Sequence, residues 1–176
     1  MAVSIAGSGG VTTNTGAVYD GLQSGTEVTA SGTAVNFTGI PSWAKRVTVM
    51  LNGVSTNGTS PLLVQLGISS GVETSGYAGT TTFSYTGVAV ATLSSGFNFA
   101  LSTLDTATAV RHGSICFTKI TGNVWSGSGG VCTTSTPSTA TVFGTKSLAG
   151  VLDRVRITTV GGANTFDAGT INIIYE

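Results

Sequence analysis

Apolar and polar residues alternate along several short segments of this chain. In residues 45–51 the alternation places Val47, Val49 and Leu51 on one face, and the apolar residues of 62–66 repeat the pattern. Successive side chains of a β-strand point to opposite faces, so a period of two predicts a strand with one buried face. Both segments are therefore predicted to be β-strands that contribute one face to a core.

Similar patterns continue to the last residue. Strands are predicted in five more regions, which are residues 83–91, 97–101, 114–125, 139–148 and 151–176. Two apolar runs of the third region flank Thr121-Gly122-Asn123, which indicates a hairpin. The last region breaks at Gly161-Gly162 and ends on a strand pattern, so the final residues are expected to lie in a sheet. Residues 102–109 suit either a helical turn or a loop.

The pattern as a whole predicts the fold class. Many short strands separated by turns such as Asn52-Gly53 and Asn57-Gly58 are typical of two packed sheets. Residues 1–33 are rich in Gly, Ser and Thr and contain few large apolar residues. The sequence therefore predicts an all-β protein, a jelly-roll-like antiparallel β-sandwich over residues 34–176. Residues 1–33 are predicted to form an extended Gly/Ser/Thr-rich N-terminal arm or a set of short edge strands.

The composition favours a domain that belongs to a larger assembly over a free soluble domain. Only 8% of the residues are charged, the formal net charge is +0, and 26 of the 176 residues are glycine. Ordinary soluble domains carry about 25% charged residues, which help to keep them dispersed. We therefore expect this chain to be part of an assembly. Neither sign of charge dominates, which argues against a nucleic-acid partner, and no apolar run is long enough to insert into a membrane.

Candidate catalytic and metal-binding chemistry is sparse. The single histidine, His112, is more simply explained as a strand or loop residue bonded to its neighbours than as part of a triad with Asp105. No pair of acidic residues has the spacing of a glycosidase or a calcium loop. Cys116 and Cys132 do not form a CxxC pair, and we expect them to be small buried residues rather than zinc ligands. A disulfide between them is the alternative, which a reducing host cytoplasm disfavours. We expect no enzyme activity, no cofactor and no metal.

A few side chains are candidates for contacts with a receptor or another subunit. Tyr77, Tyr85 and Trp125 are candidate surface aromatics, although core packing is the more common role of such rings. Asp153, Arg154 and Arg156 place alternating charges on one strand. These charges suit either a solvated face or an interface between subunits.

Two segments resemble a known family when they are taken together. The first is Phe37-Thr38-Gly39-Ile40-Pro41-Ser42-Trp43 with the strand that follows it to residue 58. The second is Leu152-Asp153-Arg154-Val155-Arg156-Ile157-Thr158-Thr159 with residues 164–176. They resemble a domain found at the ends of bacteriophage tail-fibre-like proteins and in small virion proteins. The two segments bracket most of the chain.

The resemblance implies a β-sandwich that assembles, often as a homotrimer, on a virion surface. It implies a structural protein of a tailed bacteriophage, in particular a tail-fibre or receptor-binding subunit, with other virion proteins and a host cell-surface glycan as candidate partners. The first basic residue is Lys45, so no signal peptide is expected, and release from the host cytoplasm by lysis fits this start. Only a short arm precedes the domain, which raises the alternative of a capsid decoration protein or a small tail-associated subunit.

Overall fold

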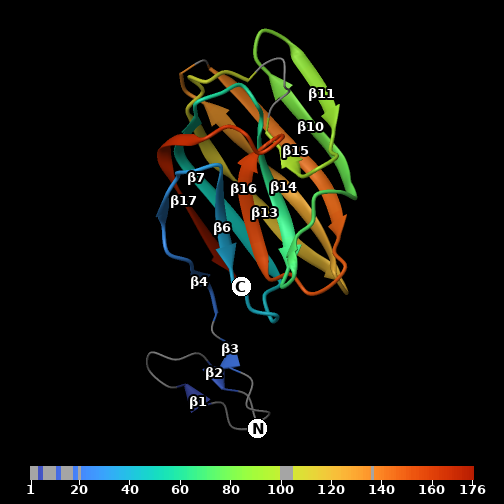
Figure 1. Cartoon of the computed structure of the whole chain (residues 1–176). Helices are drawn as coiled ribbons and strands as arrows, with labels where there is room; N and C mark the ends of the chain where they lie inside the picture. Colours follow the sequence, from blue (N-terminus) through green and yellow to red (C-terminus); the bar gives the residue numbers. More distant parts are fainter. Residues whose placement is uncertain (1–3, 6–10, 13–17, 20, 100–104, 136) are drawn as a thin grey trace.

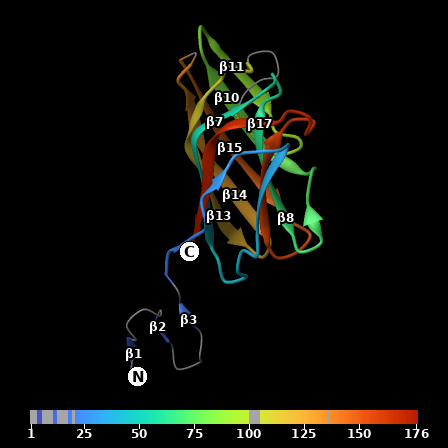
Figure 2. The same cartoon turned by 60° about the vertical axis from the view of Figure 1, so that its left-hand side comes forward.

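The computed structural model describes residues 4–5, 11–12, 18–19, 21–99, 105–135 and 137–176. Within these residues the protein is all-β, and two antiparallel sheets pack face to face (Figures 1 and 2). The predicted β-sandwich is confirmed. The more specific predictions, a jelly roll and the division into an arm and a domain at residue 34, stay predictions.

The larger sheet has nine strands in the part of the chain that the structure describes. In order across the sheet they are β11 (Val88–Thr92), β10 (Tyr77–Ser84), β15 (Ser138–Ser147), β14 (Val124–Thr133), β13 (Arg111–Thr121), β7 (Arg46–Thr56), β17 (Phe166–Tyr175) and β4 (Gln23–Ser24), with β5 (Val28–Thr29) also paired to β17. All of these pairings are antiparallel.

The smaller sheet covers one face of the larger one. Its strands, in order, are β12 (Phe97–Asn98), β8 (Leu62–Ile68), β16 (Arg154–Thr159) and β6 (Ala34–Thr38), with β9 (Gly71–Val72) paired to β8. A separate three-stranded sheet contains β1 (Ser4–Ile5), β2 (Val11–Thr12) and β3 (Val18–Tyr19). Within residues 1–33, β4 and β5 thus act as short edge strands of the larger sheet.

The core lies between the two sheets and follows the predicted alternation. Val47 and Val49 of β7 are fully buried and face Val155 and Ile157 of β16, which are equally buried. Phe97 packs against Phe117 with ring centroids 5.0 Å apart, an edge-to-face geometry that favours aromatic pairs. The apolar face predicted in residues 45–51 therefore packs in one core with Val155 and Ile157, whereas Val151 precedes β16 and is 50% exposed.

Two local predictions are wrong, each for a physical reason, and a third is tested only in part. Asn52-Gly53 does not turn the chain, because β7 continues through it as a bulge in which Gly53 has φ 65°. Residues 83–91 do not form one strand, because a turn divides them between β10 and β11. In this turn Tyr85 donates its backbone N–H to Gly87 O. Residues 97–101 give only the two-residue β12, and Leu101 lies outside the described residues.

Other local predictions are confirmed. β13 and β14 form the predicted hairpin, with Gly122 at φ 51° in its turn. Residues 138–147 form β15, and the chain ends in β17. The described part of residues 102–109, from Asp105 onward, contains turns but no helix, so this segment forms a loop there.

The sandwich has two different ends. β4 pairs with the last residues of β17, and the backbone N–H groups of Lys45 and Arg46 donate to Glu176 O, so these segments share one end with the C-terminus. The β10–β11 turn lies at the other end, at the top of Figures 1 and 2. Ser84 is paired with Thr139, which brings the β10–β11 and β14–β15 turns side by side there. We call this the tip end.

Candidate functional site

The tip end carries a shallow hollow that we call the tip hollow. Its volume is about 580 Å³, which is within the range of small-molecule sites. Its lining comes from the ends of β10, β14 and β15, and consists of Ser84, Tyr85, Cys132, Thr133, Thr134, Pro137, Ser138 and Thr139. The hollow therefore combines hydroxyl groups with one aromatic ring and contains no charged side chain.

Tyr85 is the large residue of this hollow. Its side chain is 51% exposed, and the N–H of its own backbone is fixed by Gly87 O at 3.0 Å. An exposed ring on a defined turn is a suitable surface for stacking a flat apolar face of a ligand. The predicted role of Tyr85 as a contact residue stays a prediction, and the structure gives it an accessible position.

The other two predicted aromatics lie in the core. Tyr77 is 6% exposed, and its hydroxyl accepts the Leu66 N–H at 2.9 Å and donates to Glu73 O at 2.8 Å. Trp125 is 2% exposed. The surface role is therefore wrong for both, and core packing, the more common role of such rings, holds. Each shares the inward parity of its strand, Tyr77 with Phe83 and Trp125 with Val131.

Arg154 and Arg156 lie on the outer face of the smaller sheet, as the parity of β16 predicts. Arg154 forms an ion pair with Asp153 at 2.9 Å and donates to Ser69 O at 2.8 Å. The Arg156 Nε donates to Asn36 Oδ1 at 2.9 Å. Both guanidinium groups thus have partners within the chain, while their use in a subunit contact stays a prediction.

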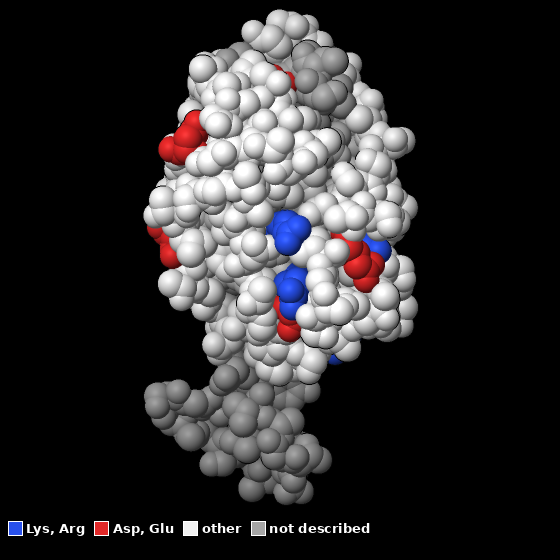
Figure 3. Space-filling model, viewed as in Figure 1, with Lys and Arg blue, Asp and Glu red and all other residues white. Residues whose placement is uncertain are grey.

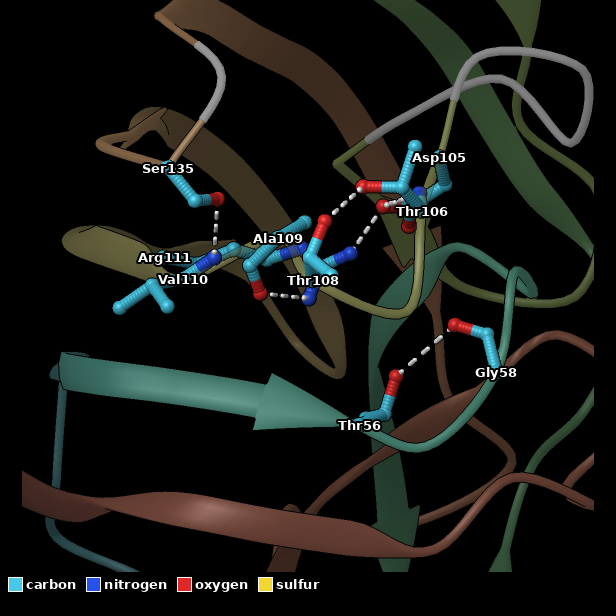
Figure 4. Close-up of polar contacts among 9 residues, drawn as sticks. All are labelled: Thr56, Gly58, Asp105, Thr106, Thr108, Ala109, Val110, Arg111 and Ser135. Carbon is cyan, nitrogen blue, oxygen red and sulfur yellow. Dashed lines mark hydrogen bonds and ion pairs between the residues drawn. The ribbon is translucent and has the colours of Figure 1, made fainter.

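Close to the tip end lies a buried ion pair that the sequence analysis missed. Arg111 has the inward parity of β13, and its Nη2 donates to Asp105 Oδ1 (Figure 4). Its Nη1 donates to Ala109 O at 3.1 Å, and Asp105 Oδ1 also accepts the Thr106 N–H. Burial raises the pKa of Asp105, and the nearby Arg111 charge only partly offsets that effect. Arg111 and Asp105 are six residues apart across a loop, and no sequence period links them.

A second polar cluster joins the two sheets beneath Tyr77. The Glu73 carboxylate forms an ion pair with Lys146, and its Oε1 accepts the Ala149 N–H at 2.8 Å. Burial acts to raise the pKa of Glu73, but the Lys146 hydrogen bond, the Ala149 N–H and the Lys146 charge together lower it. Burial also raises the pKa of Tyr77 above its ordinary range. Tyr77 and Lys146 are buried while Glu73 is partly exposed, so this cluster pairs the buried Lys146 charge at the margin of the core.

His112 and the cysteines lie on the outer face of the larger sheet. His112 Nδ1 accepts the Gly53 N–H at 3.2 Å, as expected of a strand histidine bonded to its neighbours. Asp105 pairs with Arg111 instead of His112, so these residues do not form a catalytic dyad. Cys116 is half-buried and Cys132 exposed, and both are free. The prediction that both cysteines are buried is therefore wrong.

The outer face of β10, β11, β14 and β15, which we call the neutral flank, carries no charge. No charged residue lies between Glu73 and Asp105 or between Lys119 and Lys146. Lys146 itself is 5% exposed and bound to Glu73 beneath the sheet. Figure 3 shows that charged atoms also form only a few separate spots on the face that it displays.

Large apolar side chains are exposed on the neutral flank. Val88 is 72% exposed, and Val90 and Phe143 are each 61% exposed. The register places Thr80 between Thr92 and Phe143, so threonine side chains separate the apolar ones. These residues were not predicted as contact candidates from the sequence, although the alternation in 88–92 with no charge is a signal that could have identified Val88 and Val90.

No group of His, Cys, Asp and Glu among the described residues could hold a metal ion. The described part also contains no helix long and apolar enough to cross a membrane. Comparison of the chain with models of known protein families, with curated proteins and with solved structures gives no match. The candidate surfaces are therefore the tip hollow and the neutral flank.

Proposed function

We propose that this chain is a non-enzymatic structural protein on the surface of a tailed bacteriophage particle, where it acts as a tail-fibre or receptor-binding subunit. The tip end would face the host, and the end that holds the C-terminal strand would face the particle. Homo-oligomeric assembly, a trimer according to the resemblance, would repeat the same weak contact several times. Repeated weak contacts give strong attachment through avidity.

The main observation that supports the proposal is that the two ends of the sandwich differ. The turns that surround Tyr85 lie at the tip end, while β4 and the last residues of β17 are paired at the opposite end. An attached subunit needs one end for anchoring and another for contact. The tip hollow supplies hydroxyl groups and one exposed ring, which are groups suited to a neutral glycan.

A capsid decoration protein is the second candidate, and the neutral flank favours it. Four adjacent strands present an outer face without charge. Burying such a face against a capsid surface would not remove any ion from water, which is the costly step in covering a charged face. In this case the flank, rather than the tip end, would make the functional contact.

The receptor-binding proposal predicts that the purified protein competes with the virion for host cells. Tyr85→Ala should raise the concentration for half-inhibition of adsorption about fivefold, since an aromatic contact is worth about 1 kcal/mol. The measurement is the fraction of free phage after mixing with cells and increasing protein.

Two control variants sharpen this test. Tyr85→Phe keeps the ring and should compete nearly as well as the wild type. Leu22→Ala removes a side chain of similar exposure, 61%, beside β4 at the opposite end, and it should not change competition. If the wild-type protein does not compete at any concentration, the receptor-binding role is wrong.

A further inference from the structure

Among the described residues, one edge of the larger sheet has no strand paired to its outer side. β11 is its terminal strand, and none of the described strands pairs with its outer side. Its five residues are Val88, Ala89, Val90, Ala91 and Thr92, with no charge and no proline. An exposed edge of this kind is a template for pairing with another strand, and soluble proteins usually protect it.

The other sheet edges are protected by different means. At the far side of the larger sheet, β4 and β5 have only two residues each, and the exposed Glu27 lies between them. In the smaller sheet, β12 and β9 are equally short. β6 lies beside a charge, because its exposed Asn36 accepts a hydrogen bond from Arg156. Among the described edge strands of the two packed sheets, β11 thus combines a length of five residues with the absence of a charged neighbour.

The hydrogen bonds at both ends of β11 show which backbone groups are free. Leu93 N–H donates to Gly79 O at 2.9 Å, and Tyr85 N–H donates to Gly87 O at 3.0 Å. Bonding alternates along an antiparallel strand, so residues 87, 89, 91 and 93 bond toward β10. The N–H and C=O groups of Val88, Val90 and Thr92 therefore point outward along the open edge.

We infer that β11 pairs with β11 of a second copy of this chain, antiparallel and about a two-fold axis beside Val90. The free residues are symmetric about Val90, so Val90 would bond to Val90 of the other copy and Val88 to Thr92. The two larger sheets would then continue as one sheet.

The composition of the edge favours an identical partner. β11 and the neutral flank beside it carry no charge, so a charged partner strand would lose hydration without gaining an ion pair. An identical strand brings valine opposite valine, and such β-branched pairs stabilise adjacent strands. An isologous contact of this kind is the commonest way in which identical chains assemble. The inferred β11–β11 contact would add to any three-fold contact, and it does not depend on the proposed phage function.

Disulfide trapping tests the register. In a background in which Cys116 and Cys132 are changed to Ser, Val90→Cys places two thiols opposite each other, where paired Cα atoms lie about 5.5 Å apart. That spacing suits a disulfide, which needs about 4.4–6.8 Å. Mild oxidation should convert most Val90→Cys chains into a covalent dimer.

Val88→Cys is the matched control, because Val88 lies on the same strand and is more exposed, 72% against 61%. It faces Thr92 of the other copy, so Val88→Cys alone should remain uncrosslinked, and the double variant with Thr92→Cys should crosslink. Equal crosslinking of the Val88→Cys and Val90→Cys variants would show random collision and overturn the inference, as would the absence of crosslinking at Val90.

The mass in solution gives an independent test without cysteine. Val90→Lys would place two like charges opposite each other, and sedimentation should show an oligomer with fewer chains than the wild type. Val151→Lys changes a 50% exposed valine outside the larger sheet and should leave the wild-type mass. The inference is wrong if Val90→Lys keeps the wild-type mass, or if the wild-type protein is a monomer at micromolar concentration.

Discussion

At the scale of single residues, small differences in position along a strand decide whether a side chain packs or faces solvent. Gly127 of β14 is an example, because an added Cβ would come within 2.5 Å of Phe97 and 2.9 Å of Phe117. A glycine here lets the two rings meet edge to face beneath the larger sheet. Neighbouring Ser128 lies on the opposite, exposed face, where no such limit applies.

The last strand gives a direct test of this residue-level account. Ile173 is 3% exposed in the core, so Ile173→Ala should lower the free energy of unfolding by about 2–5 kcal/mol because it leaves a cavity. Asn172 has the opposite parity and bonds to Ser24 Oγ at 3.3 Å, so Asn172→Ala should cost far less. Urea unfolding of both variants measures the difference, and an Ile173→Ala protein as stable as the wild type would contradict the packing described here.

At the scale of elements, the sequence predicted strands well where alternation was long. Alternate residues are buried in the first half of β7, in β16 as far as Ile157 and in the second half of β17, and a hairpin joins β13 to β14. The boundary between β10 and β11 was not predicted, because Gly87 is the one typical turn residue between them and neither Asn nor Pro is present. The turn predicted at Asn52-Gly53 became a bulge, since β7 pairs with β13 and β17 on both sides and those pairings continue past it.

The candidate contacts were harder to predict than the strands. Tyr77 and Trp125 proved buried, as the inward parity of their strands indicates. Tyr85 has the same parity as Tyr77 but proved exposed, because it lies in the turn that follows β10. The Arg111–Asp105 pair depends on a loop that folds back onto β13, and sequence spacing does not reveal such a contact. The open edge of β11 depends on strand order, which is a property of the whole sheet.

The cluster of Glu73 and Lys146 predicts a specific pH response. The pKa of Glu73 is lowered in the folded protein from its ordinary value of 4.5, so the folded state holds its proton less tightly than the unfolded state does. This group therefore adds stability above pH 4.5, and that stability is lost as the pH falls through the lower pKa of the folded protein.

A comparison with Glu73→Gln isolates this contribution. At neutral pH the variant should be less stable than the wild type, and the difference should shrink as the pH falls below 4.5. Asp105, whose pKa is raised, acts in the opposite direction but is present in both proteins and drops out of the comparison. Thermal unfolding at a series of pH values measures the difference, and a gap that stays constant down to pH 3 would refute the role of Glu73.

At the scale of the whole molecule, three surfaces have different properties. The tip end presents Tyr85 and hydroxyl groups, the opposite end holds β4 against the last residues of β17, and the neutral flank ends in the open edge of β11. Few ions interrupt this surface, since only 8% of the residues are charged. A protein with this surface is suited to repeated contact with copies of itself and with a particle.

The two proposed functions use these surfaces differently, so orientation on the particle separates them. A receptor-binding subunit would stand on the end that contains Glu176 and hold Tyr85 outward. A decoration protein would lie with its neutral flank against the capsid and appear at regular positions over the whole shell.

The most direct test of the central claim is a cryo-electron microscopy map of purified phage particles that carry this protein. The account predicts a β-sandwich on the outer surface, in several copies, with the Tyr85 end pointing away from the particle at the tail. Copies spread over the capsid with the flank inward would support the decoration role instead. Absence of the protein from intact, infectious particles, or a position inside the capsid, would contradict the claim that it is a surface protein of the virion.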